Sequence, residues 1–206
     1  MSAASDPPAR ARSGSPARPR ERMIAAAREI IARDGVGRLR ITDVTDSGGV
    51  GRGSFYNHFG SREDLVAAVV SDSLERLAVR TVADLPEHPD PAVAASASDR
   101  RFIRIAVDDP PLARLLVNLA HSDDVFLAAV GPFARRVLEP GLASGRLFVP
   151  DLDVAMAVLG GGAIATIRAV LSTGASAGAD SAHAEMMLRQ FGVPPAEAAE
   201  ISRLPL

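Results

Sequence analysis

The chain of 206 residues contains 23 basic residues, all of them arginine, and 25 acidic residues, and it has no cysteine. The missing cysteine excludes disulfides, thiolate metal sites and thiol catalysis, and the missing lysine excludes P-loop phosphate sites and Schiff-base chemistry. Residues 1–60 carry ten arginines and six acidic residues, whereas residues 61–206 carry thirteen and nineteen. The amino-terminal part is therefore basic and the rest of the chain acidic, which indicates that the amino-terminal part binds a polyanion.

Residues 1–19 consist mainly of Ser, Ala, Pro and Arg and contain no apolar block. This composition predicts a disordered arm, and neither a signal peptide nor a stable helix. Its arginines either enter a minor groove or, as the favoured alternative, add only weak attraction to phosphates.

A first helix is predicted at residues 20–34, where Met23, Ala27, Ile30 and Ile31 form one apolar stripe and a glycine follows. Residues 41–62 then predict two short helices joined by a turn. Three glycines allow the chain to turn sharply between them. In the second helix two phenylalanines four positions apart share the face that packs.

The opposite side of that second helix carries Arg52, Gly53, Tyr56 and Asn57. Arg and Asn suit base edges in a major groove, Tyr suits a phosphate, and the glycine allows close approach to the DNA backbone. The pattern is typical of a recognition helix, although ordinary packing in an all-helical domain produces similar apolar pairs.

Together with residues 20–35, this segment resembles the amino-terminal domain of the tetracycline-repressor (TetR) family of transcriptional regulators. The Tyr-x-His-Phe run with its upstream Gly-Val is more specific than a generic helix-turn-helix. The matching residues are Met23, Ile24, Ala26, Ala27, Ile30, Ile31, Gly35, Val44, Gly49, Val50, Gly53, Tyr56, His58, Phe59 and Leu65. The chain departs from the family pattern at Arg40, Thr45 and Gly51, and the glycine cap supports its helix less by roughly a few tenths of a kcal/mol. From pattern and resemblance together we expect DNA contacts from Arg40, Thr42, Arg52, Gly53, Ser54, Tyr56, Asn57, His58 and Arg62.

A long helix is predicted from Ser61, which resembles a capping box with Asp64, and its apolar stripe continues to Leu85. At that length it would extend roughly 35 Å and link the amino-terminal helices to the rest of the chain. Further helices follow by their apolar period, separated by residues 108–111, 122–124 and 141–150. Asp151 is expected to cap a helix at 152–172, and two more are expected at 181–191 and from Pro195.

The resemblance implies that this second part binds a small molecule and forms a dimer. The expected pocket combines apolar walls with polar groups that orient the ligand, although core packing explains any single member equally well. The pocket candidates are Phe102, Leu116, Asn118, Leu119, His121, Phe126, Phe133, Met156 and Arg168.

Small residues recur at every fourth position of the helix at 152–172, and such a ridge lets a second helix approach closely. The resemblance implies a four-helix dimer interface, although packing within one chain remains an alternative. The interface candidates are Ala157, Gly161, Ala165, Ala169, Ala184, Met187, Leu188 and Phe191.

One motif suggests a hydrolase, because Ser176 sits in a Gly-x-Ser-x-Gly pattern followed by Asp180 and His183. A nucleophile elbow needs a preceding strand, whereas the preceding residues have helical spacing, so we expect a linker and no enzyme. No pair of histidines has metal-ligand spacing, and no cofactor is expected. The uncharged stretch 154–167 is expected to be too short to cross a bilayer.

The sequence therefore predicts an all-α protein: a disordered arm at 1–19, a three-helix helix-turn-helix head at 20–66 and a helical-bundle body at 67–206. The expected function is a cytoplasmic, homodimeric repressor that a small apolar effector releases from palindromic double-stranded DNA. The alternatives are a ligand-independent DNA-binding protein, an activator with the same head and, distantly, a hydrolase using Ser176.

Overall fold

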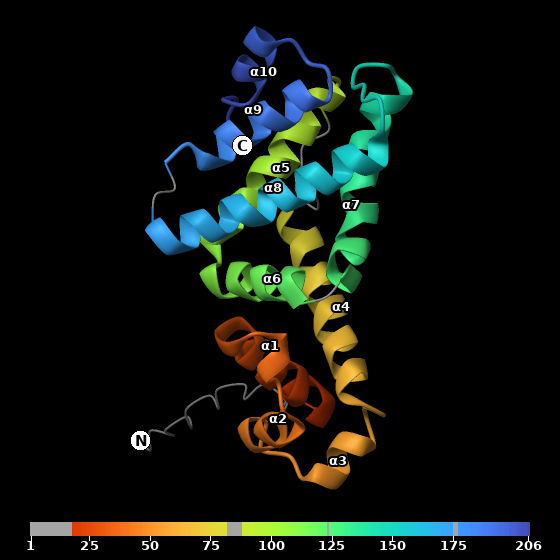
Figure 1. Cartoon of the computed structure of the whole chain (residues 1–206), viewed down its shortest axis with the longest axis vertical. Coiled ribbons are helices and arrows are strands. Elements are labelled where there is room, and N and C mark those ends of the chain that lie inside the picture. Colours follow the sequence, from red (N-terminus) through yellow and green to blue (C-terminus); the bar gives the residue numbers. More distant parts are fainter. Residues whose placement is uncertain (1–17, 82–87, 123, 175–176) are drawn as a thin grey trace, which may run out of the picture.

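In a computed structural model, which describes residues 18–81, 88–122, 124–174 and 177–206, the chain forms helices and no strands within those ranges. The head, at the lower end of Figure 1, holds α1 (Pro19–Asp34), the short 3-10 helix η1 (Val36–Arg38), α2 (Ile41–Ser47) and α3 (Arg52–Tyr56). The long α4 (Arg62–Thr81) rises from the head into the body. The body contains α5 (Pro91–Asp108), α6 (Pro110–Ser122), α7 (Asp124–Ala143), α8 (Leu152–Thr173), α9 (Ala179–Gln190) and α10 (Pro195–Ile201). The expected all-helical head and body are confirmed.

Local sequence signals explain where several helices begin. Pro19 stands at the start of α1, where its missing N–H costs no hydrogen bond, and the Glu21 carboxylate accepts from the Arg18 backbone N–H at 3.1 Å. Ser61 Oγ accepts from the Asp64 N–H at 3.0 Å and so caps α4 as expected. Asp151 caps α8 in the same way through the Val154 N–H at 3.0 Å.

Two expected boundaries differ from the structure. Residues 108–111 separate two helices as expected, but the break is narrower: α5 ends at Asp108 and α6 begins at Pro110, because proline is tolerated in the first turn of a helix. Residues 141–150 were expected to form a loop, but α7 continues to Ala143. The expected end of the α4 stripe, Leu85, lies outside the described residues, and the 20 described residues of α4 extend about 30 Å.

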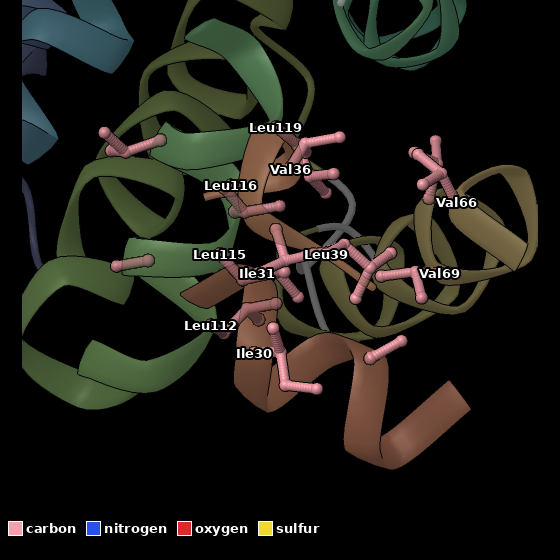
Figure 2. Close-up of a cluster of buried hydrophobic side chains, with 14 of the residues drawn as sticks. Ile30, Ile31, Val36, Leu39, Val66, Val69, Leu112, Leu115, Leu116 and Leu119 are labelled. Carbon is pink, nitrogen blue, oxygen red and sulfur yellow. The ribbon is translucent and has the colours of Figure 1, made fainter. Parts of the chain in front are cut away.

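The head and the body share one hydrophobic core. Figure 2 shows side chains of α1, η1, α4 and α6 meeting at this joint, among them Ile31, Val36, Val69, Leu115 and Leu116. Asn118 of α6 adds a polar contact, because its amide donates to the backbone carbonyls of Ile31 and Ala32 at 2.9 and 3.1 Å. These are carbonyls in the last turn of α1, where partners within the helix run out. The α1–α6 joint therefore fixes the head on the body.

A second core lies at the far end of the body, between α5, α7, α8, α9 and α10. Arg146 closes its edge by pairing with Asp90 at 2.9 Å and with Glu197 at 2.6 Å. Asp90 also caps α5, since its carboxylate accepts from the Ala92 N–H at 2.9 Å. The Arg146 guanidinium, bonded to Asp90, holds the pKa of that carboxyl below its ordinary value. One ionised carboxylate thus joins the start of α5 to the loop before α8.

Candidate DNA-binding surface and ligand cavity

The turn between α2 and α3 is shaped by glycine and held by α1. Gly49 has φ 61°, a left-handed conformation that favours glycine, and Arg22 of α1 donates to its carbonyl at 3.3 Å. Behind the turn Phe55 is fully buried and Phe59 is 4% exposed. Their rings lie 5.6 Å apart, so the packing face predicted for this pair is present.

The opposite side of α3 faces outward and carries the polar groups expected to bind DNA. Arg52, Gly53, Asn57 and His58 are exposed, and Tyr56 is 63% exposed although it is a large aromatic residue. Because α3 ends at Tyr56, Asn57 and His58 lie in the turn that follows. The outward surface is therefore built from a short helix and the first residues after it.

The remaining expected DNA contacts divide into two groups. Arg40 is exposed at the start of α2, and Thr42 and Ser54 are partly exposed. Arg62, in contrast, is directed into the head: its guanidinium donates to the backbone carbonyls of Leu39, at 3.0 Å, and Val36. The expectation that Arg62 binds phosphate is corrected, because these bonds fasten α4 to the segment before α2.

A cavity of about 480 Å³ opens inside the body, between α4, α5, α7 and α8. It lies where the two cores meet, with Leu77 and Ala163 from the first and Leu138 and Met187 from the second. Most of its wall is apolar. Among the described residues, the polar side chains that line it belong to Thr81, Ser98, Asp99 and Arg135.

The structure places only three of the expected pocket residues, Phe102, Phe133 and Met156, in the cavity wall. Leu116, Leu119 and Asn118 belong to the α1–α6 joint, and Arg168 is exposed on α8. The side chains of His121 and Phe126 lie outside the described residues. These four residues are therefore not in the cavity wall. For Leu116 and Leu119, helical periodicity rightly indicated burial but does not tell which neighbour the buried face meets.

The sequence analysis missed Asp99, a carboxylate in the cavity wall. Its Oδ2 lies 2.8 Å from Nδ1 of His183 on α9, and both side chains are 9% exposed. The next residue, Arg100, pairs with Asp180 of α9 at 3.2 Å. Asp99 precedes Phe102 by three residues and so shares its helix face, which is the signal that could have identified it.

These pairings also engage two of the three residues of the suggested hydrolase. Asp180 is bound to Arg100 and His183 to Asp99, and Ser176 lies outside the described residues. Within the described ranges no group of His, Asp or Glu residues is arranged to hold a metal ion.

The small-residue ridge of α8 is exposed. Ala157, Gly161, Ala165 and Ala169 all face outward, and nothing lies within 4 Å of a Cβ placed on Gly161. The expected α9 residues do not join them. These expected interface residues are buried in the core of their own subunit: Ala184, Met187, Leu188 and Phe191. Their place in the interface is corrected, because α9 turns these side chains toward α5 and α8.

By length and composition α8 is apolar enough to cross a membrane, because its 22 residues include a window of mean hydropathy 1.9. The helix is longer than the uncharged stretch 154–167, because it also includes the flanking charged residues Asp153 and Arg168. Only 28% of that window is buried, and the same test is passed by helices of soluble proteins. The finding leaves α8 with an apolar surface that no described part of the chain covers.

Two family models match the chain. Residues 23–69 match the model described as bacterial regulatory proteins of the tetR family, and residues 90–204 match the model described as the tetracyclin repressor-like C-terminal domain. The second match covers α5 to α10 and the first covers α2, α3 and parts of α1 and α4.

Individual relatives agree with these models. The chain is 28% identical over 151 residues to the HTH-type transcriptional repressor KstR2 of Mycolicibacterium smegmatis, covering 68% of this chain and 72% of the relative. The crystal structure of RolR in complex with the ligand resorcinol is 34% identical, with a TM-score of 0.73, over 91% of this chain and 94% of RolR. FadR of Bacillus subtilis in complex with stearoyl-CoA shares the fold at 18% identity and a TM-score of 0.68, over 82% and 98% of the two chains.

Proposed function

Because the chain belongs to the TetR family of transcriptional regulators, we propose that it is a homodimeric repressor which a small, largely apolar molecule releases from a palindromic operator. In this proposal residues 20–66 bind DNA, residues 67–206 bind the effector and the second subunit, and residues 1–19 add a basic arm. The protein would act in the cytoplasm. Its relatives are regulators and not enzymes, which agrees with the pairing of Asp180 to Arg100 and of His183 to Asp99.

The observation that carries the DNA-binding part is the outward side of α3. A guanidinium, a phenol and an amide stand there beside Gly53, whose missing Cβ leaves open space. Groups of this kind hydrogen-bond to base edges and phosphates. A buried Phe55 behind them makes the surface rigid, because its ring packs edge to face against Tyr56 at 5.3 Å.

The observation that carries the effector part is the position of the cavity beside α4. Leu77, Ala78 and Thr81 of α4 line its wall, and the same helix starts in the head, where Arg62 fastens it. An effector that favours another position of α4 would therefore also change the position of the head. Ligand and operator would then exclude each other through two conformations of one dimer.

The relatives support both the repressor and the ligand. KstR2 is a transcriptional repressor, RolR was crystallised with resorcinol and the Bacillus FadR with stearoyl-CoA. The exposed α8 ridge supports the dimer, since a second copy of α8 would cover apolar surface that the single chain leaves open.

Selection of DNA fragments by the purified full chain tests the proposal. We expect an enriched palindrome whose half-sites are separated by one helical turn, about 34–36 Å, and a footprint confined to it. Enrichment without a palindrome, or protection spread along the fragment, would contradict the proposal. A reporter carrying the selected operator, with and without the gene, then separates repression from activation.

A further inference from the structure

Asp99 places one carboxylate in an otherwise apolar part of the cavity wall. Nine-tenths of its side chain is buried, and Oδ2 is engaged by Nδ1 of His183 at 2.8 Å. A carboxylate accepts hydrogen bonds at both oxygens, and of the two Asp99 oxygens only Oδ2 has a hydrogen-bond partner among the described residues, so Oδ1 retains its accepting capacity. A ligand that offers an O–H to this oxygen satisfies it, whereas a purely apolar ligand leaves a buried acceptor without a partner.

The position of Asp99 is fixed by its surroundings. His183 is itself 9% exposed, and its Nε2 lies 3.4 Å from the point where a Cβ on Gly162 would stand, so α8 confines the ring. Arg100 holds α5 against α9 through Asp180 at the adjacent position. An acceptor held this firmly discriminates between ligands, because little ordering is needed when the ligand binds.

The other polar groups that the described residues bring to the wall do not offset the carboxylate. The Thr81 hydroxyl donates to the Leu77 carbonyl within α4 at 2.9 Å, and Ser98 adds an uncharged hydroxyl. Arg135 pairs with Asp153 of α8, and its side chain is 43% exposed. A carboxylate ligand would thus meet a buried carboxylate in an apolar wall, an arrangement that like charges oppose.

We propose that the cavity selects uncharged, hydroxyl-bearing apolar molecules, of the class of simple phenols, which donate to Asp99, and that it rejects carboxylates. The inference rests on the proposed function in taking this cavity as the effector site. It assigns to Asp99 the role of specificity-determining residue and to His183 the role of positioning it.

Calorimetric titration of the full chain without DNA tests the assignment, with probes that share one skeleton. Naphthol, methoxynaphthalene and naphthoate form a two-ring set, and resorcinol, its dimethyl ether and meta-hydroxybenzoate form a one-ring set. In at least one set we expect the hydroxyl compound to bind at least about tenfold more tightly than its ether, as a hydrogen bond to a charged acceptor implies. The compound with a carboxylate should bind most weakly of its set.

Two variants separate recognition from folding. Asp99→Asn keeps the shape and removes the charge, so the carboxylate compounds should regain affinity relative to the wild type. Asp99→Leu should reduce the preference for hydroxyl over ether to less than about threefold. Glu200→Gln removes an exposed carboxylate of α10 outside the wall and should leave all preferences as they are, and circular dichroism confirms that each variant is folded.

Three results would overturn the inference: no hydroxyl compound binds the wild type, the ether binds as tightly as the hydroxyl compound in both sets, or a carboxylate binds best in its set. Failure of the proposed function looks different, because it appears in the DNA selection. If the protein shows the expected ligand preferences but selects no operator, the inference about the ligand class stands and the proposal that the protein is a repressor fails.

Discussion

Two side chains of the head, Arg52 and Asn57, are placed to read bases. Replacing either by Ala should cost about 1–3 kcal/mol of operator binding and relax the preference at particular operator positions. Fluorescence anisotropy with the selected operator and its single-base variants measures both effects. Tyr56→Phe is the matched control on the same surface and should weaken binding evenly across sequences. Unchanged affinity and unchanged base preference for Arg52→Ala would show that another surface reads the DNA.

Arg62 has a different role, although it follows the same helix-turn-helix. Its guanidinium satisfies two backbone carbonyls, those of Val36 and Leu39, so Arg62→Ala should lower the free energy of unfolding by about 1.5–3 kcal/mol. Chemical denaturation followed by circular dichroism measures the loss. Arg38→Ala removes an exposed arginine nearby and should change stability by less than about 0.5 kcal/mol. Equal stability of the two variants would contradict the structural role of Arg62, and a phosphate contact would again be the expected role of this residue.

At this scale the sequence predicted what depends on neighbours along the chain. Gly49 and Phe55 follow from local geometry and were assigned correctly, as was Ser61 as a cap. Arg62 and Asp99 were not, because their partners lie on other elements: the Arg62 bonds reach back 23 and 26 residues, and the bond between Asp99 and His183 spans 84 residues. No pattern in one sequence fixes such a pairing.

Among the elements, α6 holds the head through Asn118. Asn118→Leu preserves the approximate size of the side chain but removes both donated hydrogen bonds to α1, so we expect a loss of about 1–3 kcal/mol in the free energy of unfolding. Hydrogen exchange should also quicken at the last turn of α1, while the amides of α9 keep their protection. Equal acceleration in both helices would mean that the variant loosens the whole protein and that Asn118 is no specific link.

The start of α5 should be sensitive to acid. The pKa of Asp90 is lowered mainly by its hydrogen bond from Arg146, so the folded state binds the proton less readily than the unfolded chain. The pairing of ionised Asp90 with Arg146 therefore stabilises the folded state. This stabilisation is fully present above the pKa of Asp90 in the unfolded chain, about 4, and it is lost as the pH falls through the lower pKa of the folded state. Arg146→Gln should therefore reduce the stability difference between pH 7 and pH 3, measured by urea denaturation at both values. An unchanged difference would contradict this role for the pair.

Periodicity predicted the helices of the body better than their packing. Leu116 and Leu119 were rightly expected to be buried, but α6 directs them to α1 and not to the cavity. Ala184 and Met187 of α9 were likewise apolar and regularly spaced, yet they face their own subunit. An apolar stripe predicts that a helix face is buried. Which other helix covers that face depends on the three-dimensional packing, which the stripe does not reveal.

For the whole molecule, the exposed α8 ridge is the feature that a single chain leaves unexplained. A mid-helix glycine costs roughly 1 kcal/mol relative to Ala, and Gly161 faces open space in the single chain. Gly161→Leu should therefore leave the subunit folded but weaken the dimer and, with it, the affinity for a palindrome. Light scattering, circular dichroism and anisotropy on one sample measure these three properties.

Glu75→Leu introduces the same side chain at an exposed position of α4 and should leave assembly unchanged. A fully dimeric Gly161→Leu protein that still binds its operator tightly would remove this part of α8 from the interface. A variant that loses its helical content would instead place Gly161 in the fold of the subunit itself.

The core shared by α1, α4 and α6 has a consequence for attempts to exchange parts between such proteins. A head cut from the chain after α4 would present the apolar face of α1 around Ile31 to water, because Leu115 and Leu116 of α6 lie against it. Transplanting the head onto another body therefore requires that the receiving α6 carry matching side chains, including a donor where Asn118 stands. In this protein the unit of exchange is the head together with its α6 surface, and a boundary drawn only along the sequence would divide a single core.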